Sequence, residues 1–164
     1  MPESAVLHLT CGKIAAGKTT FARRLAADTG AILIGWDLWL GRLYPVEIQD
    51  FDDFLRCSAR LRTVVGPHVT ALLAAGVPVV LDFPANTPPS RAWARGLADQ
   101  AGAPHRLHWL DTPEARCLSQ LARRNLERPE GSVPLSEAEF HRISAMFVAP
   151  GQDEGLTIVR HRPD

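Results

Sequence analysis

Five short apolar runs alternate along the chain with longer segments in which apolar residues recur at helical spacing. The runs occupy residues 5–10, 31–35, 77–83, 105–110 and 156–160. Their length and their content of Val, Ile and Leu predict β-strands. Strands that alternate with helices are typical of a parallel α/β sheet. No internal repeat and no Gly/Pro/Ser-rich linker divides the chain, so we expect a single domain over residues 1–164.

The helical segments carry recognisable start and stop signals. The first helix should begin near Gly17 and end before Gly30, with Phe21, Ala22 and Leu25 facing inward. A second helical region should span residues 51–75. Its apolar stripe consists of Phe54, Leu55, Leu61, Val65, Val69, Leu72 and Leu73.

Three further signals refine this pattern. Gly66 and Pro67 interrupt the second helical region, which predicts either a kink or two consecutive helices. Another helix should start with Thr112 as its N-cap and Pro113 as its first helical residue. After a Pro- and Gly-containing segment, Ser136 marks a fresh helix start.

Charge and composition exclude several classes of protein. The chain has 18 basic and 18 acidic residues and a formal net charge of +0, which argues against general binding to nucleic acid or an anionic membrane. Three distant cysteines, Cys11, Cys57 and Cys117, indicate neither a disulfide framework nor a zinc site. His105 and His108 should face opposite sides of one strand, so they cannot share a metal. Without a basic leader or a long apolar segment, we expect a cytoplasmic protein.

Residues 12–19, GKIAAGKT, match the phosphate-binding pattern G-x-x-x-x-G-K-[ST] in full. A predicted strand precedes the motif and a predicted helix follows it, as this pattern requires. Glycines allow backbone N–H groups to surround a polyphosphate at the positive end of the helix. Lys18 should reach the β and γ phosphates, and the Thr19 hydroxyl should bind Mg²⁺. The predicted nucleotide contacts are Gly12, Lys13, Ala15, Ala16, Gly17, Lys18, Thr19 and Thr20.

The use of basic residues supports this interpretation. Lys13 and Lys18 are the only lysines, whereas the other 16 basic residues are arginines. A lysine is a compact point charge on a thin stem, and an arginine is a wide planar fork. Position 18 therefore suits a narrow phosphate site, while Lys13 either adds charge near the phosphates or is simply exposed.

The class of nucleotide-binding protein follows from what accompanies the motif. A regulatory GTPase needs an NKxD-type signature, and no lysine lies beyond position 18. A remodelling ATPase usually ends its acidic strand with two acids and adds a helical lid domain, whereas here Asp82 is followed by Phe83. A kinase fits best, because it needs only the phosphate site, an acceptor pocket, a base and a cationic lid.

The phosphate-binding loop, Asp37 after the second strand, the acidic Asp82 strand and the arginine-bearing residues 116–128 together resemble the small P-loop kinases. This group includes chloramphenicol phosphotransferase, zeta toxin and bacterial single-domain proteins of AAA type. The resemblance implies a P-loop NTPase fold of the α/β class, with a five-stranded parallel sheet, helices on both faces and a short lid near residues 124–140. It also implies ATP and Mg²⁺ as cofactors.

The resemblance assigns roles to several side chains. Asp37 would be the general base that takes the proton of the acceptor hydroxyl, or it merely caps a short helix. Asp82 would orient the water shell of Mg²⁺, or it is a turn acid before Pro84. The candidate acceptor contacts on the same edge of the sheet are Asp37, Trp39, Asn86, Thr87 and Arg91, the last three in a predicted loop at residues 84–91. Trp36, Trp39 and Tyr44 could form a flat acceptor-binding wall or belong to the core.

Arg124 and Arg128 lie four residues apart in the predicted helix, beside the lid. Two guanidinium groups aimed together would neutralise the charge on the transferred phosphoryl group, or the two side chains belong to a solvated surface. Arg123 should point away from them. Residues 149–155 resemble the loop that borders the adenine in this group.

The leading hypothesis is an ATP- and Mg²⁺-dependent kinase that phosphorylates a hydroxyl of a small molecule. A toxin-like or regulatory nucleotide-binding protein that acts on a cell component is the alternative, and a nucleotide sensor without chemistry is the third. We expect no nucleic acid or membrane partner. The oligomeric state and the acceptor stay open.

Overall fold

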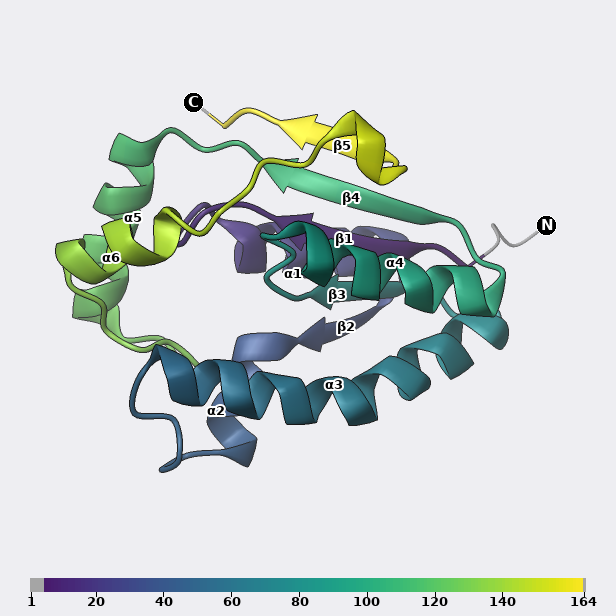
Figure 1. Cartoon of the computed structure of the whole chain (residues 1–164), viewed down its shortest axis with the longest axis horizontal. Coiled ribbons are helices and arrows are strands. Elements are labelled where there is room, and N and C mark those ends of the chain that lie inside the picture. The colour runs from purple at the N-terminus through teal and green to yellow at the C-terminus, as the bar shows by residue number, and fades with distance from the viewer. Residues whose placement is uncertain (1–4, 164) are drawn as a thin grey trace.

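A computed structural model describes residues 5–163, so residues 1–4 and 164 of the predicted domain lie outside the described part. Each predicted strand is present. The strands are β1 (Leu7–Cys11), β2 (Ile32–Gly35), β3 (Val79–Asp82), β4 (His105–Leu110) and β5 (Ile158–His161). They form one parallel sheet of five strands in the order β2-β3-β1-β4-β5 (Figure 1). The chain crosses first to one side of β1 and then to the other, which opens a crevice at the carboxyl ends of the central strands.

Helices cover both faces of this sheet, as predicted. They are α1 (Lys18–Thr29), α2 (Trp36–Leu43), α3 (Phe51–Ala74), α4 (Pro88–Ala101), α5 (Glu114–Glu127) and α6 (Glu137–Ser144), with a short 3₁₀ helix η1 (Gln152–Glu154) before β5. In Figure 1, α3 and α4 lie over the near face and α1 over the far one, whereas α5 and α6 stand at the end where the strands finish. That end holds the motif residues.

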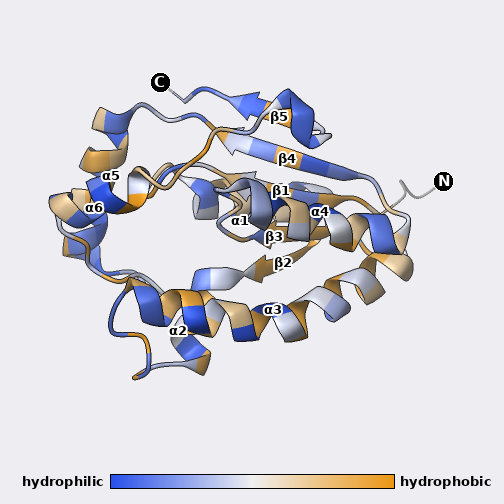
Figure 2. Cartoon of the chain, in the orientation of Figure 1, coloured by the Kyte–Doolittle hydropathy of each residue, from blue (hydrophilic) through white to orange (hydrophobic). Residues whose placement is uncertain are grey.

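The core follows from the alternation of side chains along the strands. Val79 and Leu81 of β3 belong to the cluster under α3 and α4, while Val80 packs against Ala22 and Ala26 of α1. Figure 2 shows the central strands in hydrophobic colours and the outer helix surfaces largely hydrophilic. The inward-facing Ala22 and the αL stop at Gly30 were both predicted, and both are confirmed.

Helix α3 is a single helix that continues through Pro67, so the alternative of two consecutive helices is wrong and the kink stays a prediction. The segment stays helical because its inner face is buried on both sides of the proline, at Val65 and Val69. Gly66 lies so close to α4 that a Cβ there would be 3.4 Å from atoms of Trp93 and Leu97. The residues of the predicted apolar stripe are buried or partly buried, except Leu55, which is 51% exposed.

Two helix starts differ from prediction. Helix α5 begins at Glu114, with Pro113 and not Thr112 at its N-cap. The Thr112 hydroxyl instead donates to the carbonyl of Ala16, at 2.8 Å, because the strand end brings it against the phosphate-binding loop. Helix α4 begins within the predicted loop, where Thr87 and Ser90 form a capping box. The start at Ser136 is confirmed by its capping box with Glu139.

A row of three imidazoles crosses β1, β4 and β5 on the α1 side of the sheet. His108 Nε2 lies 3.0 Å from His8 Nδ1, and His108 Nδ1 lies 3.1 Å from His161 Nε2. Burial lowers the pKa of His108 to about 4, and the charges of His8 and His161 act in the same direction. His105 faces elsewhere and accepts from the Thr157 amide, as the strand alternation predicts. His108 is therefore neutral at pH 7, and the three stacked rings pack together with Phe21.

Candidate active site

The phosphate-binding loop connects β1 to α1 in the conformation that the motif predicts. Gly12 has φ +157°, and a Cβ at this position would lie 2.8 Å from the Leu110 carbonyl oxygen. No other residue fits without displacing backbone. No side chain caps the N-terminus of α1, so the N–H groups of its first turn, at Lys18, Thr19 and Thr20, lack intrahelical acceptors. This arrangement suits an anion.

Neighbouring segments hold the loop from several sides. The Gly12 amide donates to Asn86 Oδ1 at 3.0 Å, and the Ala16 amide donates to the Lys13 carbonyl at 3.1 Å. Lys18 Nζ donates to the carbonyls of Gly12 and Lys13, at 2.6 and 2.8 Å. The loop is therefore fixed in place by its own lysine and by the segment that follows β3.

Thr19 and Asp82 bring their oxygens together, as expected for a magnesium site. The Thr19 hydroxyl donates to Asp82 Oδ2 at 2.8 Å, and the Thr10 hydroxyl donates to Oδ1 at 3.1 Å. This convergence follows from the pairing of β1 with β3. A hydroxyl and one carboxylate fit Mg²⁺, which keeps several waters and takes few protein ligands. Within residues 5–163, no group of three or more His, Cys, Asp or Glu side chains is arranged to hold a metal.

Asp37 lies in the first turn of α2, directly after β2. In the sheet register Gly35 pairs with Asp82, so the two carboxylates belong to the same edge. Asp37 is an exposed residue by its solvent-accessible area, yet the protein around its carboxyl desolvates it. This desolvation, followed by the charge of Asp82, raises the pKa of Asp37 to about 6, whereas Lys18 and Arg124 act to lower it. A carboxyl that titrates near neutrality is suited to proton transfer.

Two cations complete the cluster. Burial lowers the pKa of Lys18, and the charges of Asp82 and Asp37 oppose that effect. Burial also lowers the pKa of Arg124, and Asp37 opposes it. The Arg124 Nε is buried and has no hydrogen-bond partner among the described residues. A desolvated guanidinium of this kind is prepared to receive an anionic oxygen.

Arg128 does not accompany Arg124. Helix α5 ends at Glu127, and Arg128 is its C-cap in the left-handed region with φ +46°. Its side chain is exposed, so the two arginines do not share one helical face and the prediction of a joined pair is wrong. Arg123 points to solvent, as predicted, and pairs with Glu127.

Two predicted acceptor contacts, Arg91 and Asn86, have hydrogen-bond partners within the protein. Arg91 is fully buried: it forms a two-bond ion pair with Glu154, at 2.9 and 3.1 Å, and donates to the carbonyls of Ala85 and Val148. It ties the start of α4 to the segment before β5, and its burial leaves no surface for an acceptor. The Asn86 carboxamide oxygen accepts from Gly12, so this residue supports the loop.

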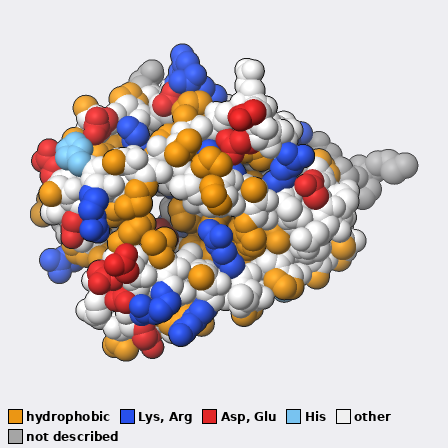
Figure 3. Space-filling view, in the orientation of Figure 1, with side chains coloured by type: hydrophobic (Ala, Val, Ile, Leu, Met, Phe, Trp, Pro, Cys, Tyr) orange, Lys and Arg blue, Asp and Glu red, His pale blue; other side chains and the backbone are white. Residues whose placement is uncertain are grey.

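The aromatic residues around Asp37 divide into two roles. Trp36 is fully buried, donates to Ser58 from its indole nitrogen at 2.8 Å and contacts Phe83, so it belongs to the core. Trp39 and Tyr44 are partly buried against the same cluster. Figure 3 shows a hollow left of centre with hydrophobic side chains on its rim, between the α5–α6 end and the side of α3 and α4.

Sequence reasoning missed three contributors to this site. Thr10 and Thr112 act through single hydrogen bonds to Asp82 and to the loop, and no motif marks either of them. Gly131, in the predicted lid, packs on α2: a Cβ there would lie 2.9 Å from the Leu38 Cα and 3.2 Å from the Asp37 carbonyl oxygen. Its place after Pro129 and Glu130 signals a turn but not this contact.

Comparison with known proteins agrees with this geometry. A family model described as an AAA domain matches residues 7–150. No curated protein matches the sequence significantly. No helix in the described part of the chain is long and apolar enough to cross a membrane.

Several solved structures share the fold. A protein of Chloroflexus aurantiacus, assigned as a kinase without a named substrate, has a TM-score of 0.79 at 15% identity, over 98% of this chain and 89% of that one. The APS kinase CysC of Mycobacterium tuberculosis, solved with AMPPNP and APS, has a TM-score of 0.63 and 19% identity, over 100% of this chain and 91% of that one. Chaetomium thermophilum Kti12, solved with ADP-AlF3, has a TM-score of 0.66 and 19% identity, over 94% of this chain and 88% of that one. The fold is therefore that of the small P-loop kinases.

Proposed function

We propose that this chain, which belongs to the AAA domain family, is an ATP- and Mg²⁺-dependent kinase that phosphorylates a hydroxyl of a small molecule. One observation carries the proposal: four charged side chains from four separate elements interact electrostatically at the carboxyl edge of the sheet. They are Lys18, Asp37, Asp82 and Arg124. A phosphate site alone would not need a titratable carboxyl beside it. The pairing of a base with a phosphate site is what phosphoryl transfer to a hydroxyl requires.

Each residue has a part in the proposed reaction. The loop amides and Lys18 bind the β and γ phosphates. Thr19 and Asp82 would hold Mg²⁺, which neutralises phosphate charge when bound. Asp37 accepts the proton of the acceptor hydroxyl while that oxygen forms its bond to the γ phosphorus, and the bond from γ phosphorus to the bridging oxygen breaks to release ADP. Arg124 stabilises the negative charge on the transferred group.

The relatives support a kinase in general and leave the acceptor open. The similar structures include a sugar kinase, a gluconokinase and an APS kinase, whose names point to different acceptors. Their identities of 14–19% carry only the fold to this chain. The acceptor must therefore be found by experiment. A cytoplasmic location fits this proposal, and it stays a prediction.

The test is turnover with a panel of acceptors. Purified protein is incubated with ATP, Mg²⁺ and hydroxylated antibiotics, nucleosides, sugars and hydroxy acids, and the products are analysed by mass spectrometry. We expect ADP together with one acceptor heavier by a phosphoryl group. Tight binding of ATP with no product from any acceptor would favour the sensor, and product found only on a cellular protein or cell-wall precursor would favour the toxin-like alternative.

A further inference from the structure

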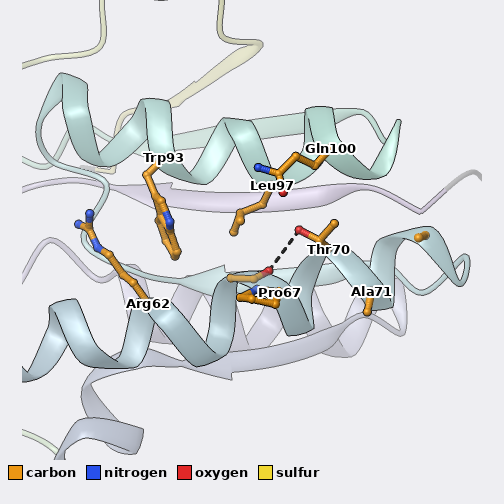
Figure 4. Close-up of a pocket in the computed structure, with 9 residues that line it drawn as sticks. Arg62, Pro67, Thr70, Ala71, Trp93, Leu97 and Gln100 are labelled. Atoms are coloured by element: carbon orange, nitrogen blue, oxygen red, sulfur yellow. Dashed lines mark hydrogen bonds between the residues drawn. The ribbon is translucent and has the colours of Figure 1, made fainter.

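Arg62, in the middle of α3, occupies an unusual position for a cation. Its guanidinium carbon lies 4.9 Å from the centre of the Phe83 ring and 4.9 Å from that of Trp93. Figure 4 shows its side chain reaching from α3 toward α4, with the guanidinium beside the Trp93 indole. Both rings hold the planar group in place through their faces.

No acidic group accompanies this cation. Among residues 5–163, Arg62 makes no hydrogen bond or ion pair, and burial alone accounts for the lowering of its pKa. Two arginines of α4 are different, because Arg91 donates to the Glu154 carboxylate and Arg95 donates to the Glu154 backbone carbonyl. The Arg62 nitrogens are not among the buried polar atoms that lack a partner, so they reach solvent. Because only water occupies these donors, an anion can take its place and bind the guanidinium directly.

The aromatic cluster beneath Arg62 connects it to the candidate active site. Phe83 directly follows the magnesium-site Asp82, and Trp36 directly precedes the base Asp37. The rings of Trp36 and Phe83 are in edge contact, with centroids 4.9 Å apart, and Trp93 contacts both. Arg62 therefore lies over the side chains that adjoin the two catalytic carboxylates, on the α3–α4 side of the sheet.

The same guanidinium closes one end of a groove between α3 and α4. The groove has a volume of about 490 Å³ and is lined mainly by apolar groups of Gly66, Pro67, Ala71, Trp93 and Leu97. Thr70, which also lines it, uses its hydroxyl on the Gly66 carbonyl, as the dashed line in Figure 4 shows. Apart from Arg62, the groove has no charged residue in its lining to bind an anion, so Arg62 provides the charged contact.

We infer that Arg62 is a specificity-determining residue that binds an anionic group, a carboxylate or a phosphate monoester, on the compound whose hydroxyl is phosphorylated. This inference rests on the proposed function and narrows its substrate class. Lys18 neutralises the phosphates of the nucleotide, Arg124 neutralises the transferred phosphoryl group, and Arg62 neutralises the acceptor. Its planar fork can take both oxygens of such a group at once.

The experiment separates acceptor binding from catalysis. Protein labelled with ¹⁵N is first saturated with AMPPNP and Mg²⁺, so that the phosphate site is filled. It is then titrated with matched pairs of compounds: glycerate and its amide, gluconate and glucose, glycerol 3-phosphate and glycerol. The Nε–H signal of Arg62, assigned by its loss in Arg62→Gln, is followed by NMR.

We expect a saturable shift of this signal with at least one anionic compound and none with its neutral partner. Arg62→Gln should weaken that binding at least tenfold, Arg62→Lys should weaken it less, and both should bind AMPPNP as the wild type does. The matched control is Arg60→Gln, an exposed arginine on the same helix, which should change nothing. Thermal melts establish that each variant is folded.

Three outcomes overturn the inference: no anionic compound shifts the Arg62 signal, Arg62→Gln binds the anion as tightly as the wild type, or neutral partners bind equally well. Binding of the anion through Arg62 without any phosphorylated product supports the anion site and removes the kinase proposal. Phosphorylation of neutral acceptors at wild-type rate by Arg62→Gln retains the kinase and removes the anion site.

Discussion

The two sides of the candidate active site are built in different ways. The phosphate side is one continuous segment, residues 12–20, and backbone atoms form most of it. The acceptor side consists of single side chains from separate elements, with Asp37 on α2, Arg62 on α3 and Arg124 on α5. On the phosphate side, Lys18 and the Thr19–Asp82 pair already have partners. The acceptor side keeps polar groups that have no partner within residues 5–163.

This difference shows which side of the site is held in its shape by the protein alone and which side depends on a ligand. A loop that is held by its own lysine, by Asn86 and by Thr112 is shaped before any ligand arrives. By contrast, the buried Arg124 Nε and the Asp37 carboxyl with its raised pKa are costly to keep without a ligand. The phosphate side is therefore preorganised in itself, and the acceptor side should gain stability when its ligand binds.

The largest effect should come from breaking the phosphate side at Lys18. Lys18→Ala removes the cation that faces the phosphates, and we expect turnover to fall on the order of 10³-fold with a loss of nucleotide affinity. Lys18→Arg should fail almost as badly, because the planar fork cannot make the two short bonds to the Gly12 and Lys13 carbonyls. Calorimetry with AMPPNP and a steady-state assay measure both. Arg23→Gln, an exposed arginine further along α1, is the control and should bind AMPPNP normally.

The next effect should come from the acceptor side at Asp37. Asp37→Asn removes the base but preserves shape, so turnover should fall about 10²-fold while AMPPNP affinity changes little. In the wild type, kcat/KM should rise with pH through about 6, because only the ionised carboxylate accepts a proton. The variant should lack this rise. Full activity in Asp37→Asn would remove its assignment as the base.

The same division explains what the sequence could predict. The strands, α1 and the phosphate-binding loop follow from local pattern, because apolar alternation and the glycine spacing are contained within a few residues of the chain. The strand order could not be read in this way, since it depends on how the crossovers pack. Asp37 and Arg124 were identified through the family resemblance, and the structure brings both beside Lys18.

Two failed predictions share a physical cause. Thr112 was assigned by a local rule as a helix cap, and Arg91 as an acceptor contact. Each one instead bonds to a segment far away in sequence, Thr112 to Ala16 and Arg91 to Glu154. Arg62 was missed because one arginine beside an apolar stripe looks like any solvated helix residue. Only the rings of Phe83 and Trp93 distinguish it.

A smaller effect should follow from separating the predicted lid from α2. Gly131 has φ +83°, and a Cβ there would meet the backbone of Leu38 at 2.9 Å. Gly131→Ala should therefore push the lid away from Asp37 and lower turnover about tenfold, with unchanged AMPPNP affinity. Gly76→Ala is a matched control, because Gly76 has the same φ of +83° but nothing within 4 Å. It carries the same backbone strain without the contact.

If Gly76→Ala lost as much turnover as Gly131→Ala, strain alone would explain the loss and the contact with α2 would have no catalytic part. The bidentate pair of Arg42 with Glu130 also links α2 to the lid. Since both side chains are exposed, this pair should contribute little. Arg42→Gln should leave turnover within about twofold of the wild type, which separates the glycine contact from the ion pair.

The smallest effect sharpens the comparison through stability. The pKa of Asp37 is raised to about 6 in the folded protein from an ordinary value of 3.8. Its ionisation therefore destabilises the fold: the contribution to stability is full below pH 3.8 and is lost as pH rises through about 6. Asp37→Asn should stabilise the protein at pH 7.5 by about 1 kcal/mol after screening by solvent, or roughly 2–4 °C in Tm. At pH 4 the difference should vanish.

Because activity requires the ionised form of Asp37 and stability favours the neutral form, the pH profiles of activity and of stability should run in opposite directions. Thermal melts of the wild type and of Asp37→Asn from pH 4 to 8 test this. A Tm that is lower in Asp37→Asn than in the wild type at pH 7.5 would mean that neighbouring groups stabilise the ionised carboxylate. The acceptor side would then be as well stabilised without a ligand as the phosphate side, and the contrast between the two sides would be wrong.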